Sequence, residues 1–179
     1  RKDMFLEGRA ENLYTGEPAF NREGEPLIFT KEVPLTGASE GAGIRPYKWP
    51  VNPSNNTGSF RNDYAFFRLA EMYLIKAEAL WRMNGPNQES VDLINRVRER
   101  AFDPNQPISE SDLSEQFFLN ERMREFHSEA KRRQDLIRFG EFTSETWDHK
   151  EESEPYRVVF PIPQSEIDSN PNLSQNAGY

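Results

Sequence analysis

The chain of 179 residues contains no cysteine. This absence excludes disulfide bonds, thiolate metal sites and a cysteine nucleophile. The two histidines, His127 and His149, are too few for a histidine-rich zinc site, and we interpret each as a surface or partly buried residue. No apolar run approaches the roughly 20 residues that a membrane-spanning helix needs. No signal peptide is visible, but the chain begins with Arg1, so we expect its natural beginning to lie upstream.

Sequence motifs of common enzyme classes are also missing. The chain has no phosphate loop, dinucleotide fingerprint, nucleophile elbow or His-Glu-x-x-His zinc site. We therefore assign no catalytic residue, no metal ligand and no cofactor. The net charge of −8 argues against nucleic acid or an anionic membrane surface as the main partner, and a neutral or cationic ligand fits better.

Glycine and proline are concentrated in residues 1–62, which hold seven of the ten Gly and six of the thirteen Pro. The apolar run "PLIFTKEV" (26–33) lies between the turn signals "NREGEP" and "GASEGAG". Turn signals on both sides of a short apolar run predict long irregular loops with at most a small β-hairpin. We expect residues 1–62 to be a loop-rich segment that contributes to the ligand-binding face.

A helical pattern begins at Asp63, the expected N-cap of a helix over residues 63–85. One apolar face of this helix holds Phe66, Leu69, Ala70, Tyr73, Ala77 and Leu80, and a second face holds Met72, Ile75, Ala79 and Met83. A helix that is apolar on two faces is predicted to lie between neighbours. "VDLINRVRERAF" (91–102), with Ser90 as its expected N-cap, predicts a second helix and a tetratricopeptide-like helix pair.

A third helix, or a helix pair, is predicted between Ser109 and Gly140, because Ser109 and Asp112 have capping-box spacing. Residues 121–138 carry six basic and four acidic side chains. We favour a helix laced by ion pairs such as Glu129/Arg133 and Lys131/Asp135 over an anion-binding site. Two carboxylates in the first helix, Glu71 and Glu78, are open to a glycosidase-like interpretation. Pairing with Arg68, Lys76 or a helix terminus is favoured, because buried charges are usually paired.

Aromatic residues in loops are the best candidates for binding. Tyr47 and Trp49 flank Lys48 in a Pro-rich loop, Asn52 follows, and Trp147 lies in a polar stretch. Exposed rings stack on the apolar faces of sugars at little entropic cost, while Asn side chains reach hydroxyl groups. We predict glycan contacts at Tyr47, Trp49, Asn52 and Trp147. The alternative is that these rings pin loops onto the helices.

Three separated stretches together resemble one family, the SusD/RagB nutrient-uptake lipoproteins of the Bacteroidetes outer membrane. They are "DYAFFRLAEMYLIKAEAL" (63–80) with "INRVRERA" (94–101), "NERMREFHSEAKRRQDLIRFG" (120–140), and "FPIPQSEIDSNPNLSQNAGY" (160–179). The chain departs from the family pattern at Ser128, where an aromatic is frequent, at Ala130, where Gly is usual, and at Ala177, where Pro is common.

The resemblance implies a mainly α, tetratricopeptide-like fold over a helical region at 63–179, and a chain that forms the C-terminal portion of a longer lipoprotein. It also implies a non-catalytic glycan-binding component of a TonB-dependent uptake system on the outward-facing surface of the outer membrane. Its partners would be an oligosaccharide or polysaccharide and a SusC-like TonB-dependent transporter. Membrane contact would pass through a lipid anchor absent from this chain, and no nucleic acid is expected.

Two other functions remain open, a glycoside hydrolase suggested by the many carboxylates and a tetratricopeptide-like scaffold that binds a protein or peptide. The tail "NPNLSQNAGY" (170–179) has neither helical nor strand periodicity, so its amides must pair with other groups. We expect an ordered tail docked across the helices, with Leu173 and Tyr179 largely buried.

Overall fold

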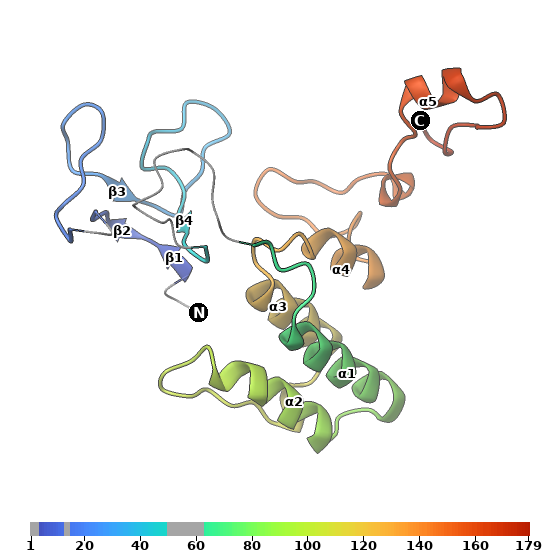
Figure 1. Cartoon of the computed structure of the whole chain (residues 1–179), viewed down its shortest axis with the longest axis horizontal. Coiled ribbons are helices and arrows are strands. Elements are labelled where there is room, and N and C mark those ends of the chain that lie inside the picture. Colours follow the sequence, from blue (N-terminus) through green and yellow to red (C-terminus); the bar gives the residue numbers. More distant parts are fainter. Residues whose placement is uncertain (1–3, 13–14, 50–62) are drawn as a thin grey trace. The chain divides into compact units, whose positions relative to one another are not determined.

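The computed structural model describes residues 4–12, 15–49 and 63–179. The chain divides into two compact units, residues 1–130 and residues 131–179 (Figure 1). The division that the sequence predicts near residue 62, between a loop-rich segment and a helical region, stays a prediction. Lys48, in the loop-rich segment, donates to the carbonyl oxygen of Glu125 at the end of a helix. The loops and the first three α-helices therefore form one unit.

The first unit is built on an antiparallel helix pair, α1 (Leu69–Asn84) and α2 (Gln88–Glu99). Gly85 ends α1 at a φ of 74°, where glycine is favoured, and its N–H donates to Trp81 O at 2.8 Å. Asn87 caps α2 by accepting from Ser90 N at 2.9 Å. The prediction of Ser90 as the cap was wrong. Ser90 is buried, and its hydroxyl donates to Ala77 O at 2.9 Å, which ties the two helices together.

The start of α1 also differs from the prediction, since the helix begins at Leu69 and not directly after Asp63. Arg68 has an extended backbone (φ −149°, ψ 157°) and provides no side-chain cap. Residues 63–68 therefore enter the helix as irregular chain. This leaves the Arg68 side chain at the helix entrance, where it bonds to groups outside α1.

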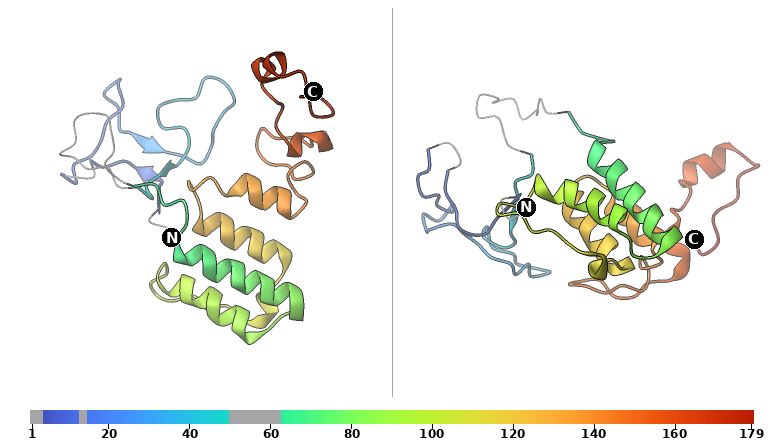
Figure 2. Two further views of the ribbon diagram at one scale, coloured as in Figure 1. Left: turned by 45° about the vertical axis from the view of Figure 1, so that its right-hand side comes forward. Right: turned by 90° about the horizontal axis from the view of Figure 1, so that it is seen from below.

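A third helix, α3 (Glu115–Glu125), lies beside α1 (Figure 2), and its Glu121 accepts from Arg98 Nη1 of α2 at 2.8 Å. The predicted capping box of Ser109 and Asp112 is confirmed, but it belongs to the short 3₁₀ helix η2 (Glu110–Asp112). Ser114 caps α3 by accepting from Phe117 N at 3.1 Å. The core of this unit gathers apolar side chains of all three helices: Leu74, Ala77, Val91, Ile94, Val97, Phe118 and Leu119.

The loop-rich segment contains two antiparallel pairs of very short strands. β1 (Phe5–Leu6) pairs with β4 (Arg45–Pro46), and β2 (Gly8–Arg9) pairs with β3 (Ile28–Phe29). The sequence predicted at most one hairpin. Both pairs join positions far apart in the chain, and such contacts leave no local pattern in the sequence.

The long helix that the sequence allowed between Ser109 and Gly140 is interrupted after α3. Ser128 and Ala130 have φ values of 63° and 56°, in the left-handed region that a helix cannot continue through. This conformation explains why glycine suits position 130. Glu129 therefore lies outside a helix, and its predicted i,i+4 helical pairing with Arg133 was wrong.

The second unit contains α4 (Arg132–Arg138), the 3₁₀ helix η3 (Pro155–Val158) and α5 (Gln164–Ser169). Arg133 on α4 holds the end of η3 and the segment that follows it. Its guanidinium lies 4.0 Å from the centre of the Phe160 ring and donates to Val158 O at 3.0 Å. One arginine thus fixes this irregular chain through both stacking and hydrogen bonding.

The C-terminal tail is ordered and folds onto residues 156–162 of its own unit. Gln175 donates to and accepts from the Ile162 backbone at 2.9 and 2.8 Å. Tyr179 donates to Val159 O at 2.9 Å and packs edge-on against Tyr156. The predicted burial of the two apolar residues was wrong, since Leu173 is 38% exposed and Tyr179 is 45% exposed. Amide and hydroxyl hydrogen bonds, not apolar burial, hold this tail.

Candidate functional site

The first unit contains a cavity of about 510 Å³, here called the loop cavity, where the Pro-rich loop meets the helices. Two of the predicted ligand-binding residues, Tyr47 and Trp49, line it together with Lys48. The helical side of the lining includes Arg68, Arg100, Ala101, Glu125 and Glu129. The cavity thus combines aromatic rings with a charged wall.

The short strand pair β1–β4 positions the aromatic side of the loop cavity. Tyr47 follows β4 directly, and its N–H donates to Met4 O at 2.6 Å, which extends the pairing with the β1 region by one bond. Trp49 is 39% exposed, and its ring lies 6.5 Å from the ring of Tyr64. A partly exposed ring that is held by neighbouring groups is suited to stacking on a ligand.

The charged wall is a cluster of ion pairs centred on Glu125 and Glu129, which we call the carboxylate cluster. Lys48 Nζ and Arg68 Nε each donate to the Glu129 carboxylate, the latter at 2.7 Å. Arg68 Nη1 and Arg100 Nη2 donate to Glu125 Oε1 at 2.6 and 2.8 Å. Glu125 and Glu129 are buried, so three cations compensate two carboxylates that have lost most of their water.

Burial and pairing act in opposite directions on the charges of this cluster. Burial disfavours the Glu129 carboxylate, but hydrogen bonds from Arg68 and Lys48 outweigh it and lower the pKa of Glu129. Burial lowers the pKa of Lys48, against the effect of its bond to Glu129. The pKa of Arg68 is raised, because its bonds to both carboxylates outweigh burial. We assign an ionised Glu129 at neutral pH, since its two oxygens serve two cations.

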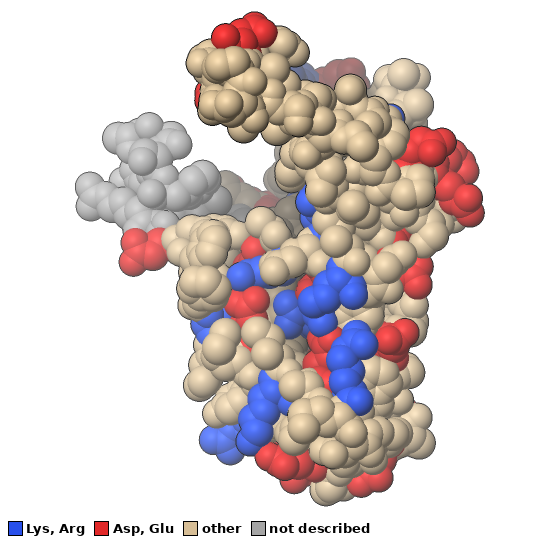
Figure 3. All heavy atoms as spheres, turned by 90° about the vertical axis from the view of Figure 1, so that its right-hand side faces the viewer, with Lys and Arg blue, Asp and Glu red and all other residues tan. Residues whose placement is uncertain are grey.

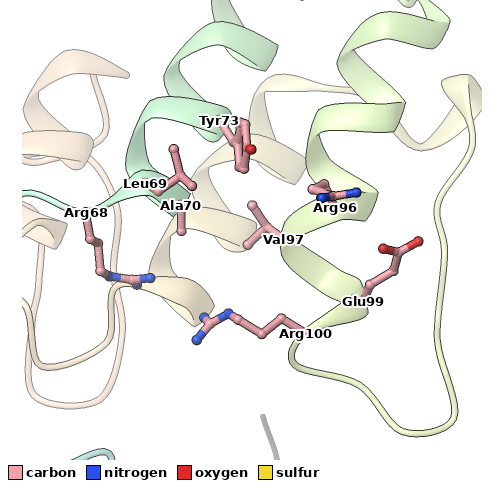
Figure 4. A pocket seen from close by; sticks show the side chains of 8 residues that line it. All are labelled: Arg68, Leu69, Ala70, Tyr73, Arg96, Val97, Glu99 and Arg100. Atoms are coloured by element: carbon pink, nitrogen blue, oxygen red, sulfur yellow. The ribbon is translucent and has the colours of Figure 1, made fainter.

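A second hollow, the helix groove, has a volume of about 670 Å³ and runs between α1 and α2. Figure 4 shows Arg68, just before α1, and Arg100, just after α2, pointing toward each other. Ala70, Tyr73 and Val97 give this groove an apolar floor, and Arg96 and Glu99 stand on its α2 side (Figure 4). Arg68 and Arg100 line both the helix groove and the loop cavity.

The other two predicted binding residues are Asn52 and Trp147. Asn52 lies outside the residues that the structure describes. Trp147 belongs to the second unit, where its backbone pairs with Lys150 and the Lys150 ammonium lies 4.8 Å from the ring centre. Trp147 is about half exposed, so its ring remains available for contact within that unit.

Several residues of the loop cavity were missed as site residues by sequence reasoning. Glu125 was assigned to a helix laced by ion pairs, and Tyr64, whose ring neighbours that of the cavity residue Trp49, was assigned to a helix. Their partners Lys48 and Trp49 lie 77 and 15 positions away in the chain. The sequence offered one signal, the placement of Lys48 between two aromatic residues. This signal indicated a binding loop, but it did not indicate which residues of the helices contact that loop.

The acidic residues of α1 have structural partners. Glu78 is buried and accepts from Arg82 Nε at 2.8 Å. Glu71 is buried with Arg122 Nη2 at 3.8 Å from its Oε1. Pairing was predicted, although with different cations. On the face shown in Figure 3, basic side chains gather over the middle, with acidic side chains between them and along the edges.

In the part of the chain that the structure describes, neither a metal-binding cluster nor a membrane-spanning helix is present. Residues 4–12, 15–49 and 63–179 include no group of three or more His, Cys, Asp or Glu side chains placed to hold a metal ion. Within the same ranges, no helix has both the length and the apolar composition to cross a membrane.

The model of the SusD family matches residues 30–157 and 142–179 of this chain. Among curated proteins, the starch-binding protein SusD of Bacteroides thetaiotaomicron is 36% identical over 156 residues, covering 81% of this chain and 27% of that protein. SusD-like protein P25 of Formosa agariphila is 37% identical over 147 residues, covering 73% of this chain and 28% of that protein. The chain thus spans little more than a quarter of these relatives.

Two solved structures share the fold. A SusD superfamily protein from Parabacteroides distasonis matches with a TM-score of 0.65 at 22% identity, over 98% of this chain and 37% of that one. Surface glycan-binding protein A from Bacteroides uniformis matches with a TM-score of 0.63 at 24% identity, over 95% of this chain and 36% of that one. The mainly helical, tetratricopeptide-like fold predicted from the sequence is confirmed.

The carboxylate cluster predicts a large stability loss when Glu129 is replaced. Glu129→Gln removes one buried charge and leaves Lys48 and Arg68 partly uncompensated, so we expect a loss of about 3 kcal/mol in the free energy of unfolding. Urea unfolding followed by circular dichroism measures it. Glu7→Gln is the matched control, because the exposed Glu7–Lys31 pair at 3.4 Å is expected to contribute less than about 1 kcal/mol. Equal losses in the two variants would contradict the prediction.

His127 predicts a pH dependence of stability. Its ring packs 4.7 Å from Phe5, and burial, followed by the charge of Lys48, lowers the pKa of His127 below its ordinary 6.5. The unfolded chain therefore binds a proton at higher pH than the folded chain, and stability falls as the pH drops below 6.5. We expect His127→Gln to reduce the fall of the thermal unfolding midpoint between about pH 6.5 and pH 5, the range in which His titrates. His149→Gln, which removes the other histidine, is the control and should keep the dependence of the midpoint on pH. If His127→Gln also keeps this dependence in full, the assignment to His127 is wrong.

Proposed function

This chain belongs to the SusD family, and from that premise we propose that it is part of a non-catalytic glycan-binding protein. The loop cavity carries the proposal within this chain, because it places Tyr47 and Trp49 on one hollow with cationic side chains of the helices. The names of two relatives, a starch-binding protein and a surface glycan-binding protein, support the same class of ligand.

The chemistry of the loop cavity fits a sugar better than a charged ligand. Trp49 offers an exposed apolar face that can stack on the C–H face of a pyranose ring. The charges of Lys48, Arg68 and Arg100 are already opposed by Glu125 and Glu129 at hydrogen-bonding distance. The hydroxyl groups of a neutral ligand could form hydrogen bonds with the charged side chains of this wall, and no ion pair of the carboxylate cluster would have to break.

Binding without catalysis is consistent with the state of the carboxylates. A glycosidase needs an acid and a base that are open to the scissile bond. Glu125 and Glu129 are instead buried and engaged by cations, and Glu78 is buried against Arg82. These acids stabilise the scaffold, which favours binding over hydrolysis.

We place the longer protein on the outward-facing surface of the outer membrane, held by a lipid anchor outside residues 1–179. We assign it a SusC-like TonB-dependent transporter as partner, to which it delivers the bound oligosaccharide or polysaccharide. Family membership supports this arrangement. Within it, the loop-rich segment would contribute to the ligand-binding face.

Replacement of Trp49 tests glycan binding at the loop cavity. Isothermal titration with maltoheptaose and a panel of other neutral oligosaccharides should identify a bound glycan. We expect Trp49→Ala to raise its Kd about three- to tenfold through loss of stacking. Phe20→Ala is the control, because Phe20 is an exposed aromatic of the same unit that does not line the cavity. Unchanged affinity in Trp49→Ala, or no binding to any glycan, would count against the proposal.

The transporter partnership has its own test. A lipidated polypeptide of SusD length that carries residues 1–179 should co-purify with a TonB-dependent transporter from detergent-extracted outer membranes. Trp49→Ala should leave this association intact, since stacking on sugar is not part of it. Recovery of the polypeptide without any transporter, under conditions that preserve glycan binding, would reject the partnership while leaving the glycan proposal standing.

A further inference from the structure

His127 packs against the strand pair that carries the aromatic side of the loop cavity. The centre of its ring lies 4.7 Å from the centre of the Phe5 ring, at an interplanar angle of 60°. Phe5 belongs to β1 and is paired with Pro46 of β4. Tyr47 follows Pro46 directly, and Trp49 comes two residues later. The imidazole is thus connected to the two rings of the cavity through one side-chain contact and one strand pair.

This strand pair has little support of its own. β1 and β4 are each two residues long, and the bond from Tyr47 N–H to Met4 O at 2.6 Å extends their pairing by one. An isolated pair of short strands is marginally stable in water, so packing against another element must hold it. His127, which follows α3 by two residues, supplies such a contact from the helical side. A displacement of its ring would therefore reach the strands.

The charged side chains around His127 come from three parts of the first unit. Lys48 comes from the cavity loop, Glu125 and Glu129 flank His127 in its own segment, and Arg68 stands at the entrance of α1. The two carboxylates are engaged by cations of the carboxylate cluster. The charge of Lys48 is therefore the one that acts on the imidazole.

The charged residues of the strand pair are directed to other groups. The Arg45 guanidinium donates to carbonyl oxygens within residues 40–43 at 2.7 to 2.8 Å. Glu7, which follows β1, pairs with Lys31 at 3.4 Å. On the strand side, His127 accordingly meets the apolar ring of Phe5.

We propose that His127 is a positioning residue of the loop cavity, and that its protonation weakens ligand binding there by loosening the strand pair. A protonated imidazole carries a charge that is poorly solvated against Phe5 and is repelled by the Lys48 ammonium. The contact that supports β1 is then weakened, and the rings of the cavity lose their fixed position. The inference rests on the proposed function, because the ligand is the neutral glycan assigned to this cavity. Such a glycan would be held near neutral pH and released as the pH falls.

The direction of the titration follows from the same surroundings. Burial, followed by the charge of Lys48, lowers the pKa of His127 below its ordinary 6.5. The imidazole is therefore neutral at neutral pH and takes up its proton as the pH falls further. The pKa of Glu129 is lowered from its ordinary 4.5, because hydrogen bonds from Arg68 and Lys48 outweigh burial. Glu129 thus keeps its charge while the imidazole titrates.

The first experiment tests His127 without a ligand. The chain has two histidines and three tryptophans, so each imidazole and each 5-fluorotryptophan can be followed by NMR and assigned with His149→Gln and Trp49→Phe. We expect the fluorine signal of Trp49 to shift with the midpoint of the His127 titration. The signal of Trp81, which packs against Phe118 on the helices, should not follow this titration. A Trp49 signal that is independent of the His127 titration would overturn the proposal.

The second experiment measures the effect on binding by isothermal titration with the glycan that the oligosaccharide panel identifies. Its Kd should be about fivefold higher at about pH 5 than at about pH 7.5, a coupling of the size found between sites in proteins. His149→Gln is the matched control and should keep this difference. Because linkage is reciprocal, saturating glycan should lower the pKa of His127 by the logarithm of the same factor. Circular dichroism at both pH values checks that the chain stays folded.

Two substitutions separate the ring of His127 from its charge. His127→Phe keeps an aromatic ring against Phe5 and takes up no proton, so it should bind the glycan with the affinity seen at neutral pH under both conditions. His127→Gln removes the ring contact and should bind more weakly, again without dependence on pH.

The outcomes distinguish this inference from the proposed function. Equal affinities of the unsubstituted chain at the two pH values, or a pH dependence that persists in His127→Phe, would overturn the role of His127 and leave glycan binding standing. Absence of glycan binding at both pH values would count against the proposed function, while the fluorine titration of Trp49 still decides whether His127 positions the loop.

Discussion

The buried carboxylates of Glu125 and Glu129 join the irregular part of the first unit to its helices. Lys48 arrives from the loop-rich segment, Arg68 from the entrance of α1 and Arg100 from the end of α2. Short strands of two residues contribute few ladder bonds, and most of the described loop residues (4–12 and 15–49) lie outside these strands. A desolvated ion cluster supplies what these elements lack, namely a directional contact that is strong because each charge would be poorly solvated without its partner.

This constraint also shapes the loop cavity. Lys48 is anchored between Tyr47 and Trp49, so the two rings are carried by a residue whose ammonium group is fixed against Glu125 and Glu129. A loop that is rigid at its centre can present aromatic rings with little entropy left to lose on binding. The same cluster neutralises the cationic side of the hollow. Its role in the scaffold and its suitability for a neutral sugar therefore have one physical origin.

The second unit reaches order by a different route. Arg133 stacks on Phe160 and donates to the neighbouring carbonyl oxygens, while Gln175 and Tyr179 bond to the same stretch of chain. Gly178 is required in this arrangement, because a Cβ there would lie 2.4 Å from the Tyr156 ring. Side-chain hydrogen bonds to the backbone can order a segment without burying its apolar residues. For that reason Leu173 and Tyr179 stay substantially exposed.

The sequence by itself determined the family, the helical class and the helix pair, because these depend on short-range patterns such as the periodicity of residues 69–84 and the spacing of Ser109 and Asp112. It also singled out Tyr47 and Trp49, which share the loop cavity. Only the tertiary structure decided the partners of Glu129, the division at Ala130 and the solvent exposure of Met72 and Ile75 on α1. Each of these depends on contacts between distant residues or on a left-handed backbone at a non-glycine residue. Periodicity describes which residues share a face of a helix, but what covers that face is set by the packing of the whole chain.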